Sequence, residues 1–300
     1  MSSRESSNQN SLLYHICALI PVTVWGASFI STKVLLTEGL NAVEIYIYRF
    51  LLAYVLTFLV CPKPLMSNSW KDELKFAVCG ICGGSIYFIA ENTAVIYTLV
   101  SNVSLIVALA PLLTTLIIGV MYKDDRPSKG MLAGSVIAFL GVGCVIFNSS
   151  FVLSIKPFGD LLALLAALSW AIYSIGLRSL SAVYSTWFVS RKTFFYGVVT
   201  ALPFLLFEPS CATWEMMTRP VVLCNLLFLG LVCSMAAYIF WSVAVAKLGA
   251  LKSGNYLYVS PLVTLLLSAL LLGENVSVIG YAGCGLILAG LILSEKLKIK

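Results

Sequence analysis

The chain of 300 residues is 60% hydrophobic and 11% charged, and its formal net charge is +6. Soluble domains carry about 25% charged residues, so this chain has too few polar side chains to cover a water-facing surface. The composition excludes a soluble globular protein. The basic residues lie in short connections between apolar runs and give no indication of a nucleic-acid partner.

Ten apolar segments are long enough to cross a bilayer as helices, which requires about 20 predominantly apolar residues. In chain order they are 12–33, 41–61, 74–97, 100–122, 129–148, 158–178, 186–207, 221–246, 250–272 and 277–294. Their apolar residues are continuous rather than alternating, which excludes the strands of a membrane barrel. The sequence therefore predicts an all-α integral membrane protein with ten transmembrane helices and short tails at 1–11 and 295–300.

The distribution of Lys and Arg predicts the orientation of these helices. Fifteen of the 19 basic residues fall on one side of the predicted spans, a count that includes Arg191 and Lys192, and three fall on the other side. Cytoplasmic connections carry the excess of positive charge in membrane proteins. We therefore expect a multi-pass protein of the cell's inner (plasma) membrane with both termini in the cytoplasm.

The second half of the chain repeats features of the first half. Trp25 precedes Lys33 by eight residues, and Trp170 precedes Arg178 by the same interval. Further equivalent pairs, at an offset of 150, are Gly80 and Gly230, Pro111 and Pro261, Asp124 and Glu274, and Gly130 and Gly280. Each repeat (12–148 and 158–294) holds five helices, an odd number, so the second must enter from the opposite side. Inverted repeats of this kind are typical of secondary transporters, with the substrate near the midplane.

Glu91 and Arg49 are ionisable residues inside predicted spans. Glu91 lies about 9 Å below the predicted outer end of its helix, and Arg49 lies at a similar depth in the preceding span. Ionisable groups at such depth are costly and usually face a cavity or a partner. Glu91 is a candidate proton-coupling or substrate-amine site, and the alternative is an acid that joins two helices. We expect a Glu91–Arg49 pair.

Aromatic residues are predicted to line a cavity around Glu91. Tyr87 lies one helical turn before Glu91 and shares its face. The repeat places Trp241 at the position equivalent to Glu91, with Tyr238 three residues earlier. The other candidate cavity residues are Trp25, Trp170, Asn255 and Tyr258. The candidate gating or kink positions are Pro111 and Pro261, because proline inside a span frees backbone carbonyls. Helix packing is the alternative role for each of these residues.

Several enzyme classes are excluded by missing motifs. The chain lacks the GxxxxGK[ST] sequence of a P-loop ATPase. His15 is the single histidine, which excludes a Ser–His protease and a multi-histidine metal enzyme. Cys79 and Cys82 form a CxxC pair, but the remaining ligands of a zinc site are missing. We therefore expect no enzymatic activity, no metal and no cofactor, while coupling to protons stays open.

The order of the motifs resembles the ten-span EamA-type branch of the drug/metabolite transporter superfamily. A W-G-x-x-F-x-x-x-K run begins at Trp25, Arg49 follows in the next span, and Pro111 precedes an acidic loop. A G-E loop lies at Gly273–Glu274, and segment 159–170 resembles the usual opening of that family's second repeat. The resemblance covers about residues 14–294. It implies a secondary carrier, often an exporter of amino acids or other small metabolites, with a cavity between the two halves.

Two positions depart from that family's pattern. Lys123–Asp124 replaces G-E in the first repeat, and Ala171 replaces the glycine after the second tryptophan. The family pattern fixes no acid at Glu91, so the role of Glu91 rests on its depth in the membrane.

Together these features predict an alternating-access exporter of a small amphipathic metabolite. A passive channel, a scaffold or a lipid-handling membrane protein is the alternative. The expected partners are the small-molecule substrate and the lipid bilayer. Two inverted repeats form a complete bundle within one chain, so a monomer is the expected state, with a dimer through a Gly-rich face as the alternative.

Overall fold

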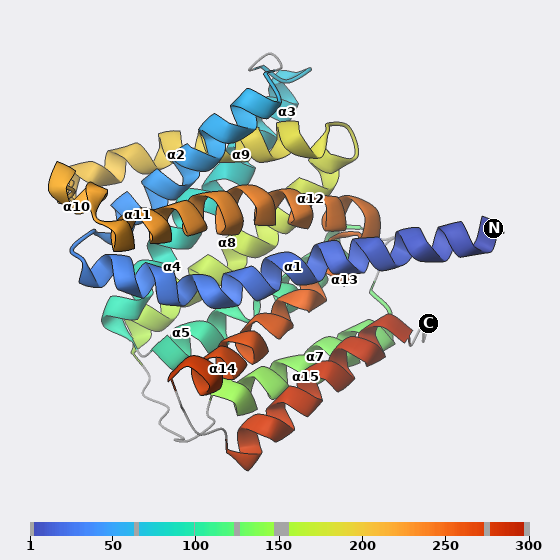
Figure 1. The fold of residues 1–300 in the computed structure, drawn as a ribbon. Helices are drawn as coiled ribbons and strands as arrows, with labels where there is room; N and C mark the ends of the chain where they lie inside the picture. Colours follow the sequence, from blue (N-terminus) through green and yellow to red (C-terminus); the bar gives the residue numbers. More distant parts are fainter. Residues whose placement is uncertain are drawn as a thin grey trace. The chain divides into compact units, whose positions relative to one another are not determined.

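The computed structural model describes residues 3–62, 66–98, 100–122, 127–146, 156–272 and 277–296 (Figure 1). All regular secondary structure in these residues is helical, which confirms the predicted all-α class. The loops that contain Lys123–Asp124 and Gly273–Glu274 lie outside the described residues, as do residues 1–2 and 297–300.

Helical structure occupies each of the ten predicted segments. The helices of the first half are α1 (Ser3–Thr37), α2 (Ala42–Val60), α3 (Trp70–Gly80), η1 (Ile81–Ser85), α4 (Ile86–Tyr97), α5 (Val100–Val107), α6 (Ala110–Met121) and α7 (Lys129–Ile146). Those of the second half are α8 (Pro157–Ser181), α9 (Thr186–Ala201), η3 (Leu202–Leu206), α10 (Trp214–Thr218), α11 (Pro220–Leu227), η4 (Phe228–Ala236), α12 (Ala237–Leu248), α13 (Ala250–Asn255), η5 (Tyr256–Tyr258), α14 (Val259–Leu272) and α15 (Val278–Lys296). The predicted tail 1–11 belongs to α1 from Ser3 onward.

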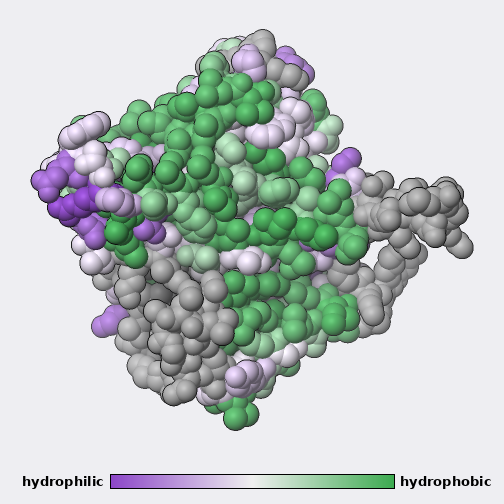
Figure 2. Space-filling model, viewed as in Figure 1, coloured by the Kyte–Doolittle hydropathy of each residue, from purple (hydrophilic) through white to green (hydrophobic). Residues whose placement is uncertain are grey.

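Within the described residues, five helices are long and apolar enough to cross a membrane. They are Ala42–Val60, Trp70–Ala94, Lys129–Ile146, Pro157–Ser181 and Pro220–Leu248, and shorter apolar helices span Leu12–Ser28, Leu105–Met121 and Val278–Ser294. Figure 2 shows hydrophobic residues over the visible face of α1, α2 and α12 and hydrophilic residues gathered around α10. Trp70 and Trp214 are 79% and 85% exposed, as is typical of tryptophans at a membrane–water interface.

Two of the apolar helices contain π-helical segments. The segment η1 joins α3 to α4, and η4 joins α11 to α12 without a break. The offset of 150 residues between the predicted repeats places 81–85 on 231–235, inside η4. π-Helical turns are rare and occur frequently at functional sites, so both segments are candidate parts of a functional site.

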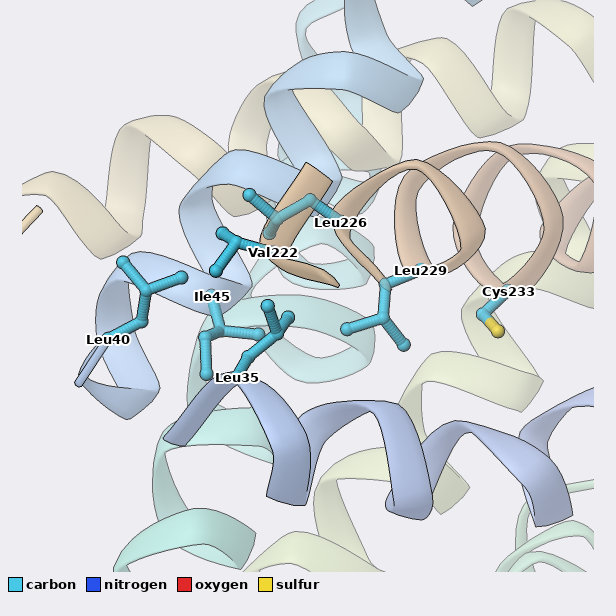
Figure 3. Close-up of a cluster of buried hydrophobic side chains, with 7 residues drawn as sticks. All are labelled: Leu35, Leu40, Ile45, Val222, Leu226, Leu229 and Cys233. Atoms are coloured by element: carbon cyan, nitrogen blue, oxygen red, sulfur yellow. The ribbon is translucent and has the colours of Figure 1, made fainter. Parts of the chain in front are cut away.

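The chain forms two compact units, each with helices from both predicted repeats. The first unit comprises Met1–Ile89 and Gly176–Leu248, and the second comprises Ala90–Ile175 and Gly249–Lys300. In the first unit, α2 packs against α9 and η4, α1 runs beside α12, and α3 and η1 pack against α9 (Figure 1). Figure 3 shows the apolar cluster at one end of this unit, formed by Leu35, Leu40, Ile45, Val222, Leu226, Leu229 and Cys233.

The second unit contains a close crossing of α7 and α15 through glycines. A Cβ atom on Gly134 would lie 2.5 Å from the carbonyl oxygen of Gly290, and one on Gly141 would lie 2.7 Å from that of Gly283. A step of seven residues forward on α7 matches seven residues backward on α15, so the two helices are antiparallel. Small residues let helices approach this closely in lipid.

Two basic residues that the sequence analysis counted in a cytoplasmic connection are buried within a helix. Arg191 and Lys192 lie inside α9 and are 0% and 1% exposed. Both residues therefore belong to a helix and not to a connection, while the membrane side assigned to them stays a prediction. Arg191 donates from Nη1 to the carbonyl oxygen of Cys61 at 2.5 Å, and Lys192 forms an ion pair with Glu73.

Candidate functional site

Arg49 lies in the middle part of α2 and is 4% exposed. Its Nε–H donates to Oγ of Ser234 at 2.8 Å, and Ser234 belongs to the π-helical segment η4. The guanidinium carbon lies 4.9 Å from the ring centroid of Phe88 and 6.0 Å from that of Phe50. A hydroxyl and two aromatic faces therefore surround a buried cation.

Three predicted cavity residues form an aromatic group close to Ser234. The ring centroid of Trp25 lies 5.8 Å from that of Tyr238 and 5.5 Å from that of Trp241. The indole Nε1–H of Trp25 donates to the carbonyl oxygen of Cys233 at 2.8 Å, one residue before Ser234. This bond attaches the aromatic group from α1 to the same π-helical segment that contacts Arg49.

The second π-helical segment takes part in an equivalent contact. The hydroxyl of Tyr238 donates to the carbonyl oxygen of Gly83, in η1, at 2.7 Å. A carbonyl oxygen has two lone pairs, so it can accept a side-chain donor in addition to its helical partner. The two π-helical segments thus each receive one aromatic donor, from Trp25 in η4 and from Tyr238 in η1.

Phenylalanines connect the aromatic group to Arg49. The ring of Phe50 lies 5.5 Å from Tyr238 and 5.6 Å from Phe88, and Phe194 of α9 lies 5.4 Å from Tyr238. Tyr87 lies 5.0 Å from Phe88. Rings at these separations attract one another in edge-to-face and tilted arrangements. Within this unit the structure therefore brings together Arg49, Tyr87, Trp25, Tyr238 and Trp241, and their shared role in a site stays a prediction.

Ser234 and Phe194 were not predicted as parts of this site. Ser234 lies four residues before Tyr238, one helical turn away, which was a usable signal for a polar residue on the same face. Phe194 had no such signal, because its position depends on how α9 packs against α2.

The remaining predicted site residues belong to the second unit. Glu91 lies in α4 and is 7% exposed. The expected Glu91–Arg49 pair stays a prediction, because the two residues belong to separate units. Trp170 is buried in α8, and its ring lies 5.2 Å from that of Tyr173. The amide oxygen of Asn255 accepts a hydrogen bond from the Ser135 hydroxyl at 2.8 Å.

Tyr258 and the two prolines lie near interruptions of the second unit's helices. Tyr258 is fully buried in an apolar cluster of α7, η5 and α15, and its hydroxyl has no hydrogen-bond partner among the described residues. Pro111 stands in the first turn of α6, directly after the turn at 108–109 that ends α5. Pro261 stands in the first turn of α14, after the short 3₁₀ segment η5. Both prolines thus follow a break in the helical ladder.

A buried charged cluster at one end of α3 was not expected from the sequence. Glu73 forms an ion pair with Lys192 and accepts hydrogen bonds from the Tyr196 hydroxyl at 2.5 Å and from the Ser67 backbone N–H at 2.9 Å. The side chains of Glu73 and Lys192 are 7% and 1% exposed. The cluster fastens the beginning of α3 to α9.

The beginning of α2 is held in place by another buried acid, Glu44. Glu44 accepts hydrogen bonds from the backbone N–H groups of Cys211 at 2.7 Å and Ala212 at 2.9 Å, and from the Ser210 hydroxyl. Glu44 also forms a capping box with Asn41, so it caps its own helix as well. Arg49 follows Glu44 by about 8 Å along the helix axis, between the two charged ends of the unit.

Potential metal ligands are dispersed in the part of the chain that the structure describes. No group of three or more His, Cys, Asp or Glu side chains lies together there. Cys79 and Cys82 both have free thiols, and Cys79 is fully buried beside Gly176, where a Cβ atom would lie 2.6 Å from its sulfur. Cys79 therefore packs against α8.

Comparison with known proteins relates the whole chain to membrane transporters. An "Uncharacterized transporter" of Archaeoglobus fulgidus is 25% identical over 284 residues, covering 93% of this chain and 96% of that protein. A "Probable terminal-alkyne amino-acid exporter" of Streptantibioticus cattleyicolor is 26% identical over 280 residues, covering 93% and 92%. A "Probable amino-acid metabolite efflux pump" of Salmonella typhimurium is 26% identical over 292 residues, covering 92% and 93%.

A solved structure shares the fold. It is titled "Crystal structure of protein", has a TM-score of 0.76 and 18% sequence identity, and the alignment covers 94% of this chain and 96% of that chain. The EamA-like transporter family matches residues 12–147 and again residues 157–295. This double match agrees with the motifs at Trp25 and at 159–170. The chain therefore belongs to the EamA-like transporter family and is a multi-pass membrane transporter rather than an enzyme.

Proposed function

We propose that the chain is a secondary active exporter of small metabolites, amino acid-like or otherwise amphipathic, that works by alternating access. The observation that carries this proposal is the buried Arg49, held by Ser234 and bordered by aromatic rings, inside a protein whose surface is apolar. Ionisable residues inside a membrane protein mark substrate or ion pathways. An aromatic wall beside a charged group suits a solute with one apolar and one polar end.

The proposed architecture is two inverted repeats of five helices, 12–148 and 158–294, with both termini in the cytoplasm. The double family match supports two repeats. The π-helical segments occupy equivalent places at the offset of 150, and so do the helix breaks before Pro111 and Pro261. Recurrence of irregular features is stronger support than recurrence of plain apolar helix, because a long apolar helix recurs in any membrane bundle.

These irregular places also suggest how the protein changes conformation. Helices bend at π-helical turns and at prolines, where the regular hydrogen-bond ladder is already interrupted. The segments η1 and η4 lie beside the site, since Gly83 accepts from Tyr238 and Ser234 accepts from Arg49. Bending at these segments would change the surroundings of Arg49 directly. Rocking of one half against the other would then expose the site to each side in turn.

The other predicted site residues have proposed roles in this cycle. Glu91 responds to protons or binds the ammonium group of the solute, and Tyr87, Tyr238 and Trp241 shape the apolar part of the site. Pro111 and Pro261 act as hinges. Two relatives are named for the export of amino acids or their metabolites, which supports solutes of this kind. A monomer in the plasma membrane is the proposed working state.

The proposal is tested by transport in proteoliposomes that contain the purified protein. Vesicles are loaded with one unlabelled L-amino acid at a time and given the same labelled amino acid outside. A carrier produces counterflow, a transient accumulation of label that saturates with concentration. Trp25→Ala is expected to reduce counterflow strongly, and the matched control Trp214→Ala, at an 85% exposed position, is expected to retain it. Fast flux without counterflow would support the channel alternative instead.

The direction of transport is tested in cells. Untargeted metabolite profiling compares the medium of cells that express this chain with that of empty-vector cells. Accumulation of a few related solutes outside the cells supports export. Depletion of those solutes from the medium would show import and overturn the exporter assignment.

A further inference from the structure

The positive charge of Arg49 is compensated incompletely by the protein around it. A guanidinium group has five N–H donors. The Nε–H donates to Ser234, and the other four N–H groups have no acceptor among the described residues of the first unit. No carboxylate of the first unit's described residues forms an ion pair with Arg49. The side chain is nevertheless only 4% exposed.

The aromatic contacts of Arg49 are too weak to offset this burial. A cation over an aromatic face gains about 0.5–2 kcal/mol. Removing an ion from water costs several kcal/mol even after the protein relaxes. The rings of Phe88 and Phe50, at 4.9 and 6.0 Å, therefore leave most of the cost unmet. An anion that the described residues of the first unit do not provide would supply the difference.

Another buried cation of the same unit has a counter-charge. Lys192 pairs with the carboxylate of Glu73, and the Tyr196 ring lies 4.9 Å from its ammonium nitrogen. The first unit thus provides a carboxylate for this buried lysine, whereas its described residues provide none for Arg49, which lies beside the aromatic group.

The geometry of Arg49 favours a planar anion with two oxygens. The guanidinium fork matches a carboxylate in a bidentate arrangement, which a lysine does not reproduce. The bond from Nε to Ser234 fixes one edge of the fork and leaves the Nη edges as donors. The guanidinium carbon lies over the face of the Phe88 ring. Ser234 is therefore a positioning residue for this fork.

We infer that Arg49 binds the carboxylate of the transported solute, while the Trp25, Tyr238 and Trp241 rings contact its apolar part. This inference rests on the proposed function and makes it more specific. The substrate class becomes carboxylate-bearing metabolites with an apolar side chain. We expect no tight binding of solutes that have the same side chain but an amide, or no group at all, in place of the carboxylate. Such solutes leave the buried cation without its counter-charge.

The first test uses the wild-type protein and chemically matched solutes. Counterflow in proteoliposomes identifies the L-amino acid with the highest rate. Its amide and its decarboxylated amine are then added as competitors and as labelled solutes. We expect the amide and the amine to compete at least about 100-fold more weakly than the amino acid, the factor given by the loss of a charge-assisted pair. Equal competition by all three compounds would overturn the inference.

The second test changes Arg49. We expect Arg49→Gln to raise the KM for the amino acid by about 100-fold, and Arg49→Lys by about 10-fold because the charge remains while the fork is lost. Competition by the neutral amide should change less than about 3-fold in both variants, a result that a merely structural role of Arg49 would not produce. Arg191→Gln is the matched control: it removes an equally buried arginine and should lower thermal stability while leaving the KM unchanged.

The outcomes separate this inference from the proposed function. If wild-type protein shows no counterflow with any amino acid, the proposed function fails and the inference fails with it. If counterflow is present and Arg49→Gln leaves the KM unchanged, the carrier assignment stands and the role of Arg49 is overturned. If Arg49→Gln does not fold, the ranking of amino acid, amide and amine on the wild-type protein decides the question by itself.

Discussion

Glu73 on α3 and Lys192 on α9 form an ion pair that is almost completely removed from solvent, with side chains 7% and 1% exposed. The two residues are 119 positions apart in the chain. They hold together the beginnings of two apolar helices, next to a carbonyl–arginine contact between Cys61 and Arg191. Charges that are buried together resist separation, because each would be left without a partner in a medium of low polarity.

Lys192→Met is expected to destabilise the protein by about 3–5 kcal/mol, because it leaves the Glu73 carboxylate buried without its counter-charge. The double variant Glu73→Gln with Lys192→Met should recover most of that loss, since both charges are gone. Unfolding of the purified protein in detergent, followed for the two single variants and the double variant, measures the coupling. Lys75→Met is the control: the Lys75–Asp72 pair lies on the same helix with side chains 50% and 19% exposed and should contribute at most about 1 kcal/mol. Additive losses in the double variant would contradict the prediction.

The glycine crossing of α7 and α15 predicts a sharp dependence on a single methyl group. A Cβ atom on Gly290 would lie 2.5 Å from the Gly134 carbonyl oxygen, a distance that forces the two backbones apart. Gly290→Ala should therefore destabilise the second unit by about 1–3 kcal/mol, the usual cost of overpacking. Gly285→Ala, on the same helix, has no atom within 4 Å of the added Cβ and should be neutral or slightly stabilising. Thermal unfolding midpoints of the two variants compare the positions, and equal midpoints would refute the crossing.

Tyr46 and Gly84 are predicted to be energetically coupled. The Tyr46 hydroxyl is buried without a hydrogen-bond partner among the described residues and lies 2.4 Å from the place of a Cβ atom on Gly84. Gly84→Ala should lower the free energy of unfolding by about 1–3 kcal/mol in the native background. In the Tyr46→Phe background the loss should be at least about 1 kcal/mol smaller, because the clashing oxygen is gone. Tyr46→Phe alone should be neutral or stabilising. Unfolding free energies of the three variants test this, with Gly143→Ala as an additive control. An unchanged cost in both backgrounds would contradict the packing.

Glu44 is predicted to order the connection before α10. Glu44→Ala removes the acceptor for the backbone N–H groups of Cys211 and Ala212 and half of the capping box with Asn41. We expect a loss of about 1–3 kcal/mol, the cost of an unsatisfied hydrogen-bonding group, because both donors are only partly buried and water can replace the carboxylate in part. Hydrogen exchange of the two amides should accelerate more than that of the α9 core. Glu215→Ala, which removes an 84% exposed acid in the neighbouring helix, serves as the control and should leave exchange at 211–212 unchanged.

The sequence predicted the positions of the helices well because apolar runs of membrane length are a direct consequence of the lipid solvent. The internal repeat named Trp241 and Tyr238 as candidate cavity residues, and the structure places their rings beside that of Trp25; their role in a site stays a prediction. The π-helical segments η1 and η4 were not predictable, because a π-turn depends on packing between helices. An example is the packing of Gly80 against Tyr196: a Cβ atom on Gly80 would lie 2.4 Å from the Cβ atom of Tyr196.

The burial of Arg191 and Lys192 was also beyond sequence reasoning. Basic residues near the beginning of a span normally count toward the cytoplasmic charge. Their burial depends on acceptors supplied by distant parts of the chain, the carboxylate of Glu73 and the carbonyl group of Cys61. A local pattern carries no information about such long-range partners. Ser234, the partner of Arg49, is different, because its place one helical turn before Tyr238 was a local signal that could have identified it.

Glu91 provides the last prediction, which separates proton coupling from a structural role. Counterflow of one solute against itself needs no net movement of protons, whereas export driven by a pH gradient does. Glu91→Gln is nearly isosteric and is expected to keep counterflow within about 3-fold while reducing gradient-driven export about 100-fold or more, because a group that cannot release a proton cannot couple to the gradient. Both rates are measured on the same proteoliposome preparation, with and without an imposed pH difference. A structural acid would behave differently: counterflow, gradient-driven export and thermal stability would then fall together, since the variant would weaken the helix contact made by this 7% exposed side chain.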